Sequence, residues 1–370
     1  MAEIVCLSTA EDRRDHIHRS VQLLSDGEII GLPTETGYVL VAHALHLAAV
    51  QRLLELAGSP IVLVCRSSDD ASDYLPVLTR IGDKLLRRAW PGPLQMVLPE
   101  AVTEGGLLKS LPDDGRSVLS KSELRVRVSS GDVLIQVGKL LPGPLVVTDE
   151  STQPKALSAQ ALAETYGDVP TLILDGGSPR FADGLTVVTV QDDDVSVTHP
   201  GVIAQESVQR LTSEVFLFVC TGNTCRSPMA EGLFRHKLAQ RIGCPEQELA
   251  NHGFYVASAG ISAGYGMSAS PESAELLRHR GIDLSMHASQ PLTERLLIQA
   301  DFVYTMTRGH RRSILEERPD LADRVQLLAA DGSDVPDPIG GGIDEYERCQ
   351  RAIEQHLDAI LNQLVTRPKS

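Results

Sequence analysis

The chain lacks the features of membrane proteins, secreted proteins and nucleic-acid-binding proteins. No apolar run approaches bilayer-spanning length, and the first residues lack the basic and long apolar segments of a signal peptide. The six cysteines are scattered apart from Cys220 and Cys225, and no Cys/His cluster has zinc spacing. Lys and Arg number 34 against 49 Asp and Glu, so the net charge is −15. We therefore expect a cytoplasmic protein with reduced thiols, no metal, no cofactor, and no general affinity for membranes or nucleic acid.

What is present suffices for two domains. With 370 residues, 42% of them hydrophobic and 22% charged, the chain can form two soluble cores. The first half mixes short apolar runs, helical patterns and Pro/Gly turns, which predicts an α/β mixture. The second half alternates strand and helix more regularly, which favours a Rossmann-like parallel sheet with helices on both faces. We expect domains over 1–205 and 214–370, joined by a linker over 206–213.

Periodicity predicts the elements of both halves. In the first half we expect strands at 29–32, 61–64, 94–98, 124–128, 145–147, 172–174 and 186–190, and helices at 12–25, 46–56, 77–89, 131–140 and 158–166. In the second half we expect strands at 215–219, 254–258, 302–306 and 325–328, and helices at 228–241, 271–280, 293–298, 311–317 and 343–365. Asp192-Asp193-Asp194 is interpreted as a solvated hairpin tip rather than a metal site, because no partner carboxylates accompany it.

The most informative stretch is Cys220-Thr221-Gly222-Asn223-Thr224-Cys225-Arg226-Ser227, which follows the predicted strand at 215–219. A strand, a tight loop and a helix start turn backbone N–H groups toward an anion. Arg226 can bind two phosphate oxygens, and the positive field favours the nucleophilic thiolate of Cys220. Ser227 is positioned to donate to the thiolate and to cap the following helix. These features predict cleavage of a phosphate ester or phosphoramidate through a phosphocysteine.

Such a reaction also needs a proton donor for the leaving group. Asp337-Pro338 lies in a segment rich in glycine and proline, 332–341, which is typical of a shaped loop that carries catalytic groups. The alternative is that Cys220 and Cys225 are only small buried residues at the end of a strand. A nucleophile, an anion-binding loop and an acid loop together favour the catalytic interpretation.

The second half resembles the low-molecular-weight protein phosphatase family over about residues 214 to 366. The residues that carry the resemblance are Cys220 through Pro228, Ser258-Ala259-Gly260, Gly281-Ile282-Asp283, Ala300-Asp301, Met306-Thr307 and Asp337-Pro338. The resemblance implies Cys220 as nucleophile, Arg226 as phosphate binder and Asp337 as general acid, then general base. It also implies that Asn223 and Ser227 order the loop, and that Cys225 can form a reversible protective disulfide with Cys220.

Thr224 bears on the substrate. Members of the family that act on phosphotyrosine usually carry a larger aliphatic residue there, whereas the phosphoarginine phosphatases carry Thr. A hydroxyl can hydrogen-bond the guanidinium side of phosphoarginine or an attacking water. Ile339 stands where the tyrosine enzymes tend to have an aromatic residue, which weakens stacking on a phenyl ring. We therefore expect a phosphorylated protein as substrate, with phosphoarginine favoured and phosphotyrosine as the alternative. The remaining interpretation is that Thr224 only orders the loop and does not select the substrate.

The first half resembles the threonylcarbamoyl-AMP synthase family, the YrdC-type fold, over about residues 8 to 205. The match rests on Pro33-Thr34-Glu35-Thr36-Gly37-Tyr38, Trp90-Pro91-Gly92-Pro93 and Asp175-Gly176-Gly177. The resemblance implies a twisted α/β sheet around a basic cavity for ATP, threonine and bicarbonate. It also implies that Thr34, Thr36, Tyr38 and Arg127 belong to that cavity.

The chain departs from that family at three motifs. Ala57-Gly58-Ser59-Pro60 replaces a Lys-x-Arg pair, Thr148-Asp149-Glu150 replaces Ser-Ala-Asn, and His199-Pro200-Gly201 replaces Arg-x-Gly. Lost cations and added acids oppose triphosphate binding, so we predict a degenerate domain that binds a small molecule or its partner domain, or regulates the phosphatase. One alternative is retained synthase activity in tRNA modification, with the phosphatase domain accessory. The other is a non-catalytic sensor of a metabolite or RNA, and RNA binding is expected only if the ancestral role persists.

Overall fold

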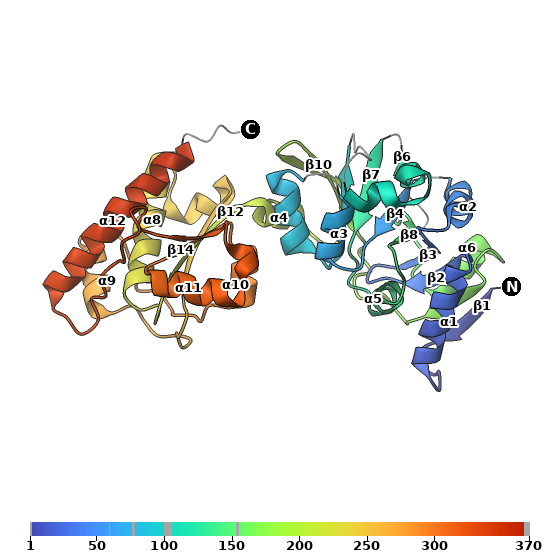
Figure 1. The fold of residues 1–370 in the computed structure, drawn as a ribbon, viewed down its shortest axis with the longest axis horizontal. Coiled ribbons are helices and arrows are strands. Elements are labelled where there is room, and N and C mark those ends of the chain that lie inside the picture. The colour runs from blue at the N-terminus through green and yellow to red at the C-terminus, as the bar shows by residue number, and fades with distance from the viewer. Residues whose placement is uncertain are drawn as a thin grey trace. The chain divides into compact units, whose positions relative to one another are not determined.

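The computed structural model describes residues 2–58, 60–75, 78–99, 106–120, 122–152 and 155–365. The chain divides into two compact units, unit 1 (Met1–Leu211) and unit 2 (Thr212–Ser370) (Figure 1). Two residues named in the sequence analysis lie outside the described residues. They are Ser59, in the segment that replaces the Lys-x-Arg pair, and Val77, where one helix was predicted to begin. The segment expected as a linker, 206–213, is largely helical, because α7 spans Gln205–Thr212.

Unit 1 contains an 11-stranded mixed sheet in the order β1-β9-β2-β3-β8-β4-β7-β5-β10-β11, with β6 paired to β7. The strands are β1 (Glu3–Cys6), β2 (Ile30–Pro33), β3 (Tyr38–His43), β4 (Ile61–Val64), β5 (Leu94–Leu98), β6 (Leu119–Ser120), β7 (Glu123–Arg127), β8 (Leu145–Thr148), β9 (Leu172–Asp175), β10 (Thr186–Gln191) and β11 (Asp194–His199). The sheet combines parallel pairs such as β4/β7 with antiparallel pairs such as β4/β8. The predicted α/β class is confirmed for this unit.

Several helices of unit 1 begin where a polar side chain binds a free backbone N–H group. They are α1 (Arg13–Ser25), α2 (Leu47–Ala57), α3 (Ser68–Tyr74), α4 (Arg80–Ala89), α5 (Asp132–Lys139), α6 (Ala159–Tyr166) and α7, with 3-10 turns η1 (Gly106–Ser110) and η2 (Pro112–Val118). Asp12 caps α1, Thr79 caps α4 and Ser158 caps α6, each through a side-chain oxygen. These caps account for helix starts close to the predicted ones.

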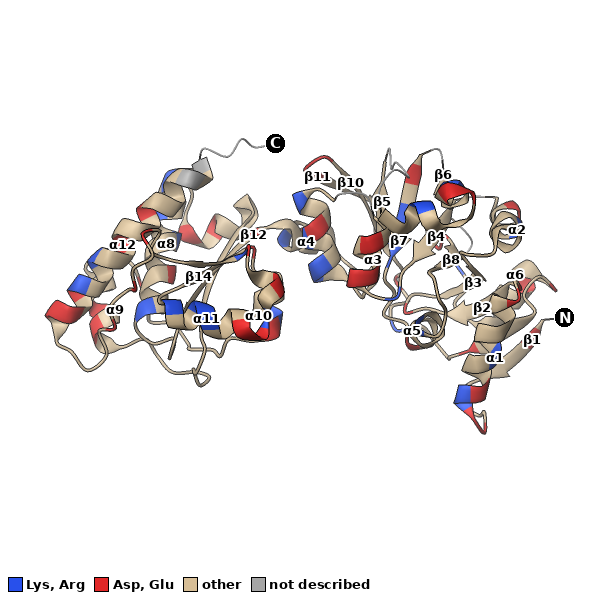
Figure 2. Ribbon diagram, in the orientation of Figure 1, with Lys and Arg blue, Asp and Glu red and all other residues tan. Residues whose placement is uncertain are grey.

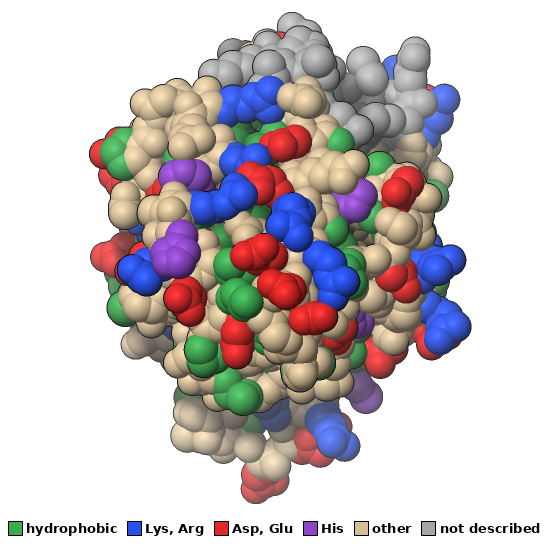
Figure 3. Space-filling view, turned by 90° about the vertical axis from the view of Figure 1, so that its left-hand side faces the viewer, with side chains coloured by type: hydrophobic (Ala, Val, Ile, Leu, Met, Phe, Trp, Pro, Cys, Tyr) green, Lys and Arg blue, Asp and Glu red, His purple; other side chains and the backbone are tan. Residues whose placement is uncertain are grey.

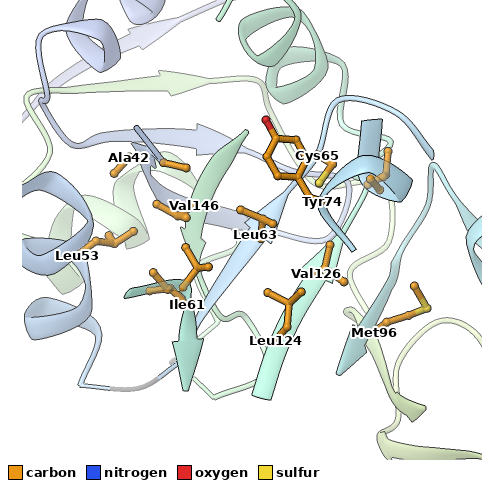
Figure 4. Packing of buried hydrophobic residues seen from close by; sticks show 14 of the residues in the cluster. Ala42, Leu53, Ile61, Leu63, Cys65, Tyr74, Met96, Leu124, Val126 and Val146 are labelled. Carbon is orange, nitrogen blue, oxygen red and sulfur yellow. The ribbon is translucent and has the colours of Figure 1, made fainter. Parts of the chain in front are cut away.

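The core of unit 1 fills the space between the sheet and the helices above it. Leu63 of β4 pairs in register with Val126 of β7 and Val146 of β8, and Figure 4 shows all three in one apolar layer. Leu53 of α2 and Tyr74 of α3 belong to the same cluster (Figure 4). Burying such side chains contributes about 1.5–3 kcal/mol each. This layer holds the central strands in a fixed arrangement.

Unit 2 contains a four-stranded sheet in the order β13-β12-β14-β15, and all its pairs are parallel. The strands are β12 (Glu214–Cys220), β13 (Phe254–Gly260), β14 (Phe302–Thr305) and β15 (Val325–Leu327). The helices are α8 (Arg226–Ile242), α9 (Pro271–Arg278), α10 (Glu294–Gln299), α11 (Arg308–Glu317) and α12 (Ile343–Val365), with η3 (Glu246–His252) and η4 (Pro319–Leu321). The predicted Rossmann-like parallel sheet is confirmed.

Alternation along β12 explains why helices cover both faces of this sheet. Phe216 and Phe218 pack in a cluster with residues of α8 and α12. Leu217 and Val219 point the other way, into a cluster with Leu297 of α10 and residues of α11. The carboxyl end of β12 therefore lies between two helical layers, and Cys220 is its last residue.

Opposite charges interleave on the helical face that carries α8 and α12. Lys237 lies 3.0 Å from Glu354 and 2.8 Å from Asp358, and Arg280 lies 2.7 Å from Glu354. Figure 3 shows a similar mixture of basic and acidic side chains on the side of unit 2 that bears α9 and α12. Among the helices described, none combines the length and apolar character needed to cross a membrane.

Candidate active site

The loop after β12 turns the chain from the sheet into α8. Cys220 ends the strand and Arg226 is the first residue of α8, so residues 221–225 make the connection. Asn223 has a φ of 56°, a left-handed backbone conformation that tightens the turn. Cys225 is the N-cap residue of α8, and its side chain makes no capping hydrogen bond. The loop therefore leads directly to a helix N-terminus that can bind an anion.

The sulfur of Cys220 lies among hydrogen-bonding groups. Cys220 is buried, with an exposed fraction of only 2%. The Ser227 hydroxyl lies 2.9 Å from Sγ, and the Asn223 N–H donates to Sγ over 3.3 Å. The expected contact between Ser227 and the sulfur is thus present. The expected capping role of Ser227 is wrong, because this residue lies inside the first turn of α8, where its hydroxyl is buried against Cys220 and Asn223.

Besides the bond from its N–H to Cys220, four hydrogen bonds hold Asn223. Its Nδ2 donates to the hydroxyls of Ser227 at 2.9 Å and Ser258 at 2.8 Å. Its Oδ1 accepts from the Gln290 N–H at 2.9 Å, and its carbonyl oxygen lies 2.8 Å from His287 Nε2. A fully satisfied buried network of this kind favours one loop conformation, which suits the predicted ordering role of Asn223.

Arg226 and Asp337 meet although 111 residues separate them. Arg226 Nη2 lies 2.5 Å from Asp337 Oδ2 and donates to Thr221 Oγ1 over 3.4 Å. Arg226 is buried, whereas the side chain of Asp337 is 45% exposed. The Asp337 carboxylate therefore has one face on the guanidinium and one toward solvent, within reach of an entering phosphate.

His310 also contacts the loop. Its Nε2 lies 2.9 Å from Thr221 Oγ1. Burial, with the charge of Arg226 as the second cause, lowers the pKa of His310 below its ordinary value. In the sequence, His310 belongs to a basic run with Arg308, Arg311 and Arg312, which is interpreted either as a rim for substrates or as partners of Glu316 and Glu317. A run of charges does not reveal which member faces the loop.

The last long helix places two polar groups behind the loop. Tyr346 Oη lies 3.4 Å from Cys225 Sγ, and burial followed by this contact raises the pKa of Tyr346 to about 12. Burial also raises the pKa of Cys349 to about 12. Cys220, Cys225 and Cys349 belong to one buried cluster and are free thiols. Sequence analysis missed Tyr346 because nothing in the sequence relates α12 to the loop.

Thr224 and Gly222 lie partly exposed on the loop. The Thr224 hydroxyl lies 3.7 Å from Cys225 Sγ. The Thr224 carbonyl oxygen accepts a hydrogen bond from the Ser270 N–H at 2.8 Å. The Ser262 N–H donates to the Thr221 carbonyl oxygen at 2.9 Å. Residues 262–270 are thereby tied to the loop at both ends. That segment carries Tyr265, which is 77% exposed. Ile339, two residues after Asp337, is 71% exposed, so apolar side chains are available at the rim of the active site.

In unit 1, three of the four expected cavity residues converge on an internal carboxylate. Glu150 accepts hydrogen bonds from the hydroxyls of Thr34, at 3.3 Å, and Thr36, at 3.0 Å. Arg127 is buried between Glu150, at 2.6 Å, and Glu35, at 2.7 Å. Burial opposes its charge, but the two carboxylates raise the pKa of Arg127. Its charge is therefore compensated within the protein.

Tyr38 lies apart from this cluster of carboxylates. Its hydroxyl donates toward Asp175 Oδ1 at 2.7 Å and the Gly177 carbonyl oxygen at 2.6 Å. Nearby, a pocket of about 360 Å³ is lined by Thr34, Glu35 and Arg180, among others. Within the described ranges, no group of three His, Cys, Asp or Glu side chains is arranged to hold a metal ion.

Known proteins similar to this chain match its two parts separately. The model of the family described as low molecular weight phosphotyrosine protein phosphatase matches residues 215–369, and that of the family described as telomere recombination, the YrdC type, matches residues 22–201.

Three relatives illustrate these matches. A protein-arginine-phosphatase of Bacillus subtilis is 39% identical over 152 residues, which cover 40% of this chain and 95% of that protein. A probable low molecular weight protein-tyrosine-phosphatase of Ralstonia nicotianae is 33% identical over 147 residues, covering 40% of this chain and 92% of that protein. A threonylcarbamoyl-AMP synthase of Pyrococcus abyssi is 25% identical over 226 residues, 58% of this chain and 62% of that protein. Through its second half, the chain belongs to the low-molecular-weight protein phosphatases, as a cysteine-dependent enzyme with a YrdC-type domain N-terminal to it.

Proposed function

We propose that unit 2 removes phosphate from a phosphorylated protein side chain through a phosphocysteine intermediate. Cys220 is the nucleophile, Arg226 and the amides of residues 221–225 bind the phosphate, and Asp337 transfers the proton. The observation that carries this proposal is the contact of 2.5 Å between Arg226 and Asp337, which brings the acid loop to the phosphate loop. Nucleophile, anion cradle and proton donor are then in one place.

In the first step, the phosphate displaces Asp337 from Arg226. Two phosphate oxygens take the guanidinium donors, and the loop N–H groups bind the remaining oxygen. The Cys220 thiolate attacks phosphorus, forming an S–P bond as the P–O or P–N bond to the substrate breaks. Protonated Asp337 donates its proton to the leaving oxygen or nitrogen.

In the second step, a water molecule attacks the phosphorus of the phosphocysteine. Asp337, now a carboxylate, accepts a proton from that water, and the S–P bond breaks to release inorganic phosphate. The sulfur leaves as a thiolate, which accepts hydrogen bonds from the Asn223 N–H and the Ser227 hydroxyl. These donors stabilise the leaving thiolate as they stabilise the attacking one.

For the substrate we propose phosphoarginine in preference to phosphotyrosine. Thr224 supports this choice, because its partly exposed hydroxyl can accept a hydrogen bond from the guanidinium part of the substrate. The relative that is named a protein-arginine-phosphatase shares 39% identity. Ile339 offers no aromatic face to a phenyl ring. Tyr265 at the rim is the observation that favours phosphotyrosine as the alternative.

The test compares two peptides that differ only in carrying phosphoarginine or phosphotyrosine, using the full chain and its Cys220→Ser variant. We expect the full chain to release phosphate from both, with higher kcat/KM on phosphoarginine. The Cys220→Ser variant should lose at least about a thousandfold in kcat, about 4 kcal/mol of barrier, while still binding vanadate. Near-normal turnover by this variant contradicts the covalent mechanism.

For unit 1 we propose a degenerate synthase fold that does not form threonylcarbamoyl-AMP. The support is the neutralisation of Arg127 by Glu35 and Glu150, which removes a cation from anion binding. Incubating the full chain with ATP, threonine and bicarbonate should therefore give no adenylate product. Product formation above a heat-inactivated control would instead favour retained synthase activity.

A further inference from the structure

A shallow groove on unit 2 lies between α11 and the edge strand β15. Its volume is about 760 Å³. Its lining includes three arginines, Arg308, Arg311 and Arg312, one acidic residue, Glu316, and the apolar Leu315 and Leu327. The net charge of the chain is −15, yet the start of α11 carries a run of basic side chains, as Figure 2 shows. The groove is therefore a locally positive region on an acidic protein.

The arginines of the groove are accessible and weakly engaged. Arg308 and Arg312 have side chains that are 73% and 78% exposed. Arg312 Nε lies 3.7 Å from Glu316, and Arg308 Nε lies 3.4 Å from Asp334. Exposed pairs of this kind contribute about 0–1 kcal/mol each, so a ligand carboxylate can replace them. Arg311 differs, because its Nε donates to the Val325 carbonyl oxygen at 3.0 Å and so lies against β15.

The groove also contains the open edge of a sheet. β15 is the last strand in the sheet order, and β14 pairs with it on one side. The Val303 N–H bonds the Arg324 carbonyl oxygen and the Leu328 N–H bonds the Thr305 carbonyl oxygen. Because a parallel ladder uses alternate residues of a strand, Val325 and Leu327 direct their main-chain groups away from β14. Arg311 already bonds the Val325 carbonyl oxygen, so the carbonyl oxygen that a peptide N–H can bond at this edge is that of Leu327. An extended peptide can hydrogen-bond to such an edge.

The helix that lines the groove also contacts the catalytic loop. His310, on the same helix, lies 2.9 Å from Thr221. The Arg308 N–H donates to Asp334 Oδ1 at 2.8 Å, so the start of α11 is bound to the segment that leads to Asp337. Gly332 of that segment lines the groove. A peptide in the groove can therefore reach the active site within a few residues.

We propose that this groove binds an extended, acidic segment of the phosphoprotein substrate, next to the phosphorylated residue. The segment adds to the edge of β15 as a further strand, and its carboxylates pair with Arg308 and Arg312. The inference rests on the proposed phosphatase function and extends it, because it names the class of protein sequence that the enzyme prefers.

The experiment uses the full chain and phosphopeptides that share one phosphorylated residue but have acidic or neutral amide flanks. The wild type should favour the acidic flank about fivefold to tenfold in kcat/KM, through KM, and salt should reduce this preference. Arg308→Gln combined with Arg312→Glu should abolish the preference. Arg351→Glu, an equivalent change at an exposed site on α12, should retain it. The turnover of a small aryl phosphate, which has no peptide flank, measures the activity of the catalytic site by itself.

A second measurement needs no protein variant. Two acidic peptides are N-methylated at alternate residues, one set at odd and the other at even positions. Only one set removes the N–H group that bonds the Leu327 carbonyl oxygen of β15, so one peptide should lose affinity and the other should not. Equal use of acidic and neutral flanks, or equal losses from both methylated peptides, overturns the proposal while aryl phosphate turnover persists. No turnover of any phosphate substrate by the wild type contradicts the proposed function as well.

Discussion

At the scale of single residues, the site combines groups that the sequence indicates with groups that it does not. Cys220, Arg226 and Asp337 were expected from residue type and spacing, and the structure brings Arg226 and Asp337 into contact. His310 and Tyr346 contact the loop from 89 and 121 residues away. Residue type alone gives no distance across such separations, so these contacts could not be predicted.

Asp337→Asn tests the proton donor. An amide cannot protonate the leaving group, so we expect kcat to fall about a hundredfold or more for a phosphate ester with a poorly acidic leaving group. A nitrophenolate leaving group needs little protonation, so kcat for a nitrophenyl phosphate should fall about tenfold or less. The measurement is a series of kcat values across leaving-group pKa. Equal losses for all leaving groups would remove Asp337 from the role of general acid.

Thr224→Ile tests the substrate preference. The substitution removes a hydroxyl from the exposed side of the loop and adds an apolar group, so the ratio of phosphoarginine to phosphotyrosine kcat/KM should fall about tenfold or more. Thr224→Ser is the matched control, because it keeps the hydroxyl and should keep most of the ratio. If the isoleucine variant shows the wild-type ratio, Thr224 does not select the substrate.

At the scale of elements, each strand predicted in the first half coincides with an observed strand to within one or two residues. Periodicity succeeds there because short apolar runs between Pro/Gly turns have few alternatives. β1, β3, β6 and β11 were not predicted, and among them β3, Tyr38–His43, is buried along its length. A continuous apolar run does not by itself distinguish a buried strand from a buried helix.

Cys225, on the loop that joins β12 to α8, should protect Cys220 from oxidation. Peroxide converts the Cys220 thiolate to a sulfenic acid, and the Cys225 thiol then displaces water to form a disulfide. Wild-type activity lost to peroxide should return with dithiothreitol, whereas the peroxide inactivation of the Cys225→Ser variant should be largely irreversible. Activity after reduction is the measurement, with Cys244→Ser, on a partly exposed cysteine, as control. Full recovery of the Cys225→Ser variant would exclude this disulfide as the protective device.

At the scale of the whole molecule, the acid stability of unit 1 should depend on His43. Its two ring nitrogens are buried without a hydrogen-bond partner among the described residues. Burial, followed by repulsion from His46, lowers the pKa of His43 to about 4. The unfolded chain therefore binds the proton first as pH falls from about 6.5. The free energy of unfolding should fall by up to about 1.4 kcal/mol per pH unit down to about pH 4, by about 3 kcal/mol in total.

Trp90 is the only tryptophan of the chain and is buried in unit 1, so its fluorescence follows the unfolding of that unit. Urea titrations at pH 7 and pH 5 measure the effect. His43→Leu should flatten the dependence on pH in this window, and His18→Gln, at an exposed position on α1, should leave it unchanged. The same slope in wild type and His43→Leu would assign the acid sensitivity to other groups.

The sequence alone determined what neighbouring residues decide: the turn from a strand through Cys220–Cys225 into a helix, and the amphipathic patterns that build two α/β units. It also indicated that Asp149 and Glu150 oppose triphosphate binding. Only the tertiary structure decided which distant charges meet. It put Asp337 on Arg226, and it buried Arg127 between Glu35 and Glu150. The reason is physical: a buried charge requires a partner, but many partners in a sequence can supply it, and packing selects among them.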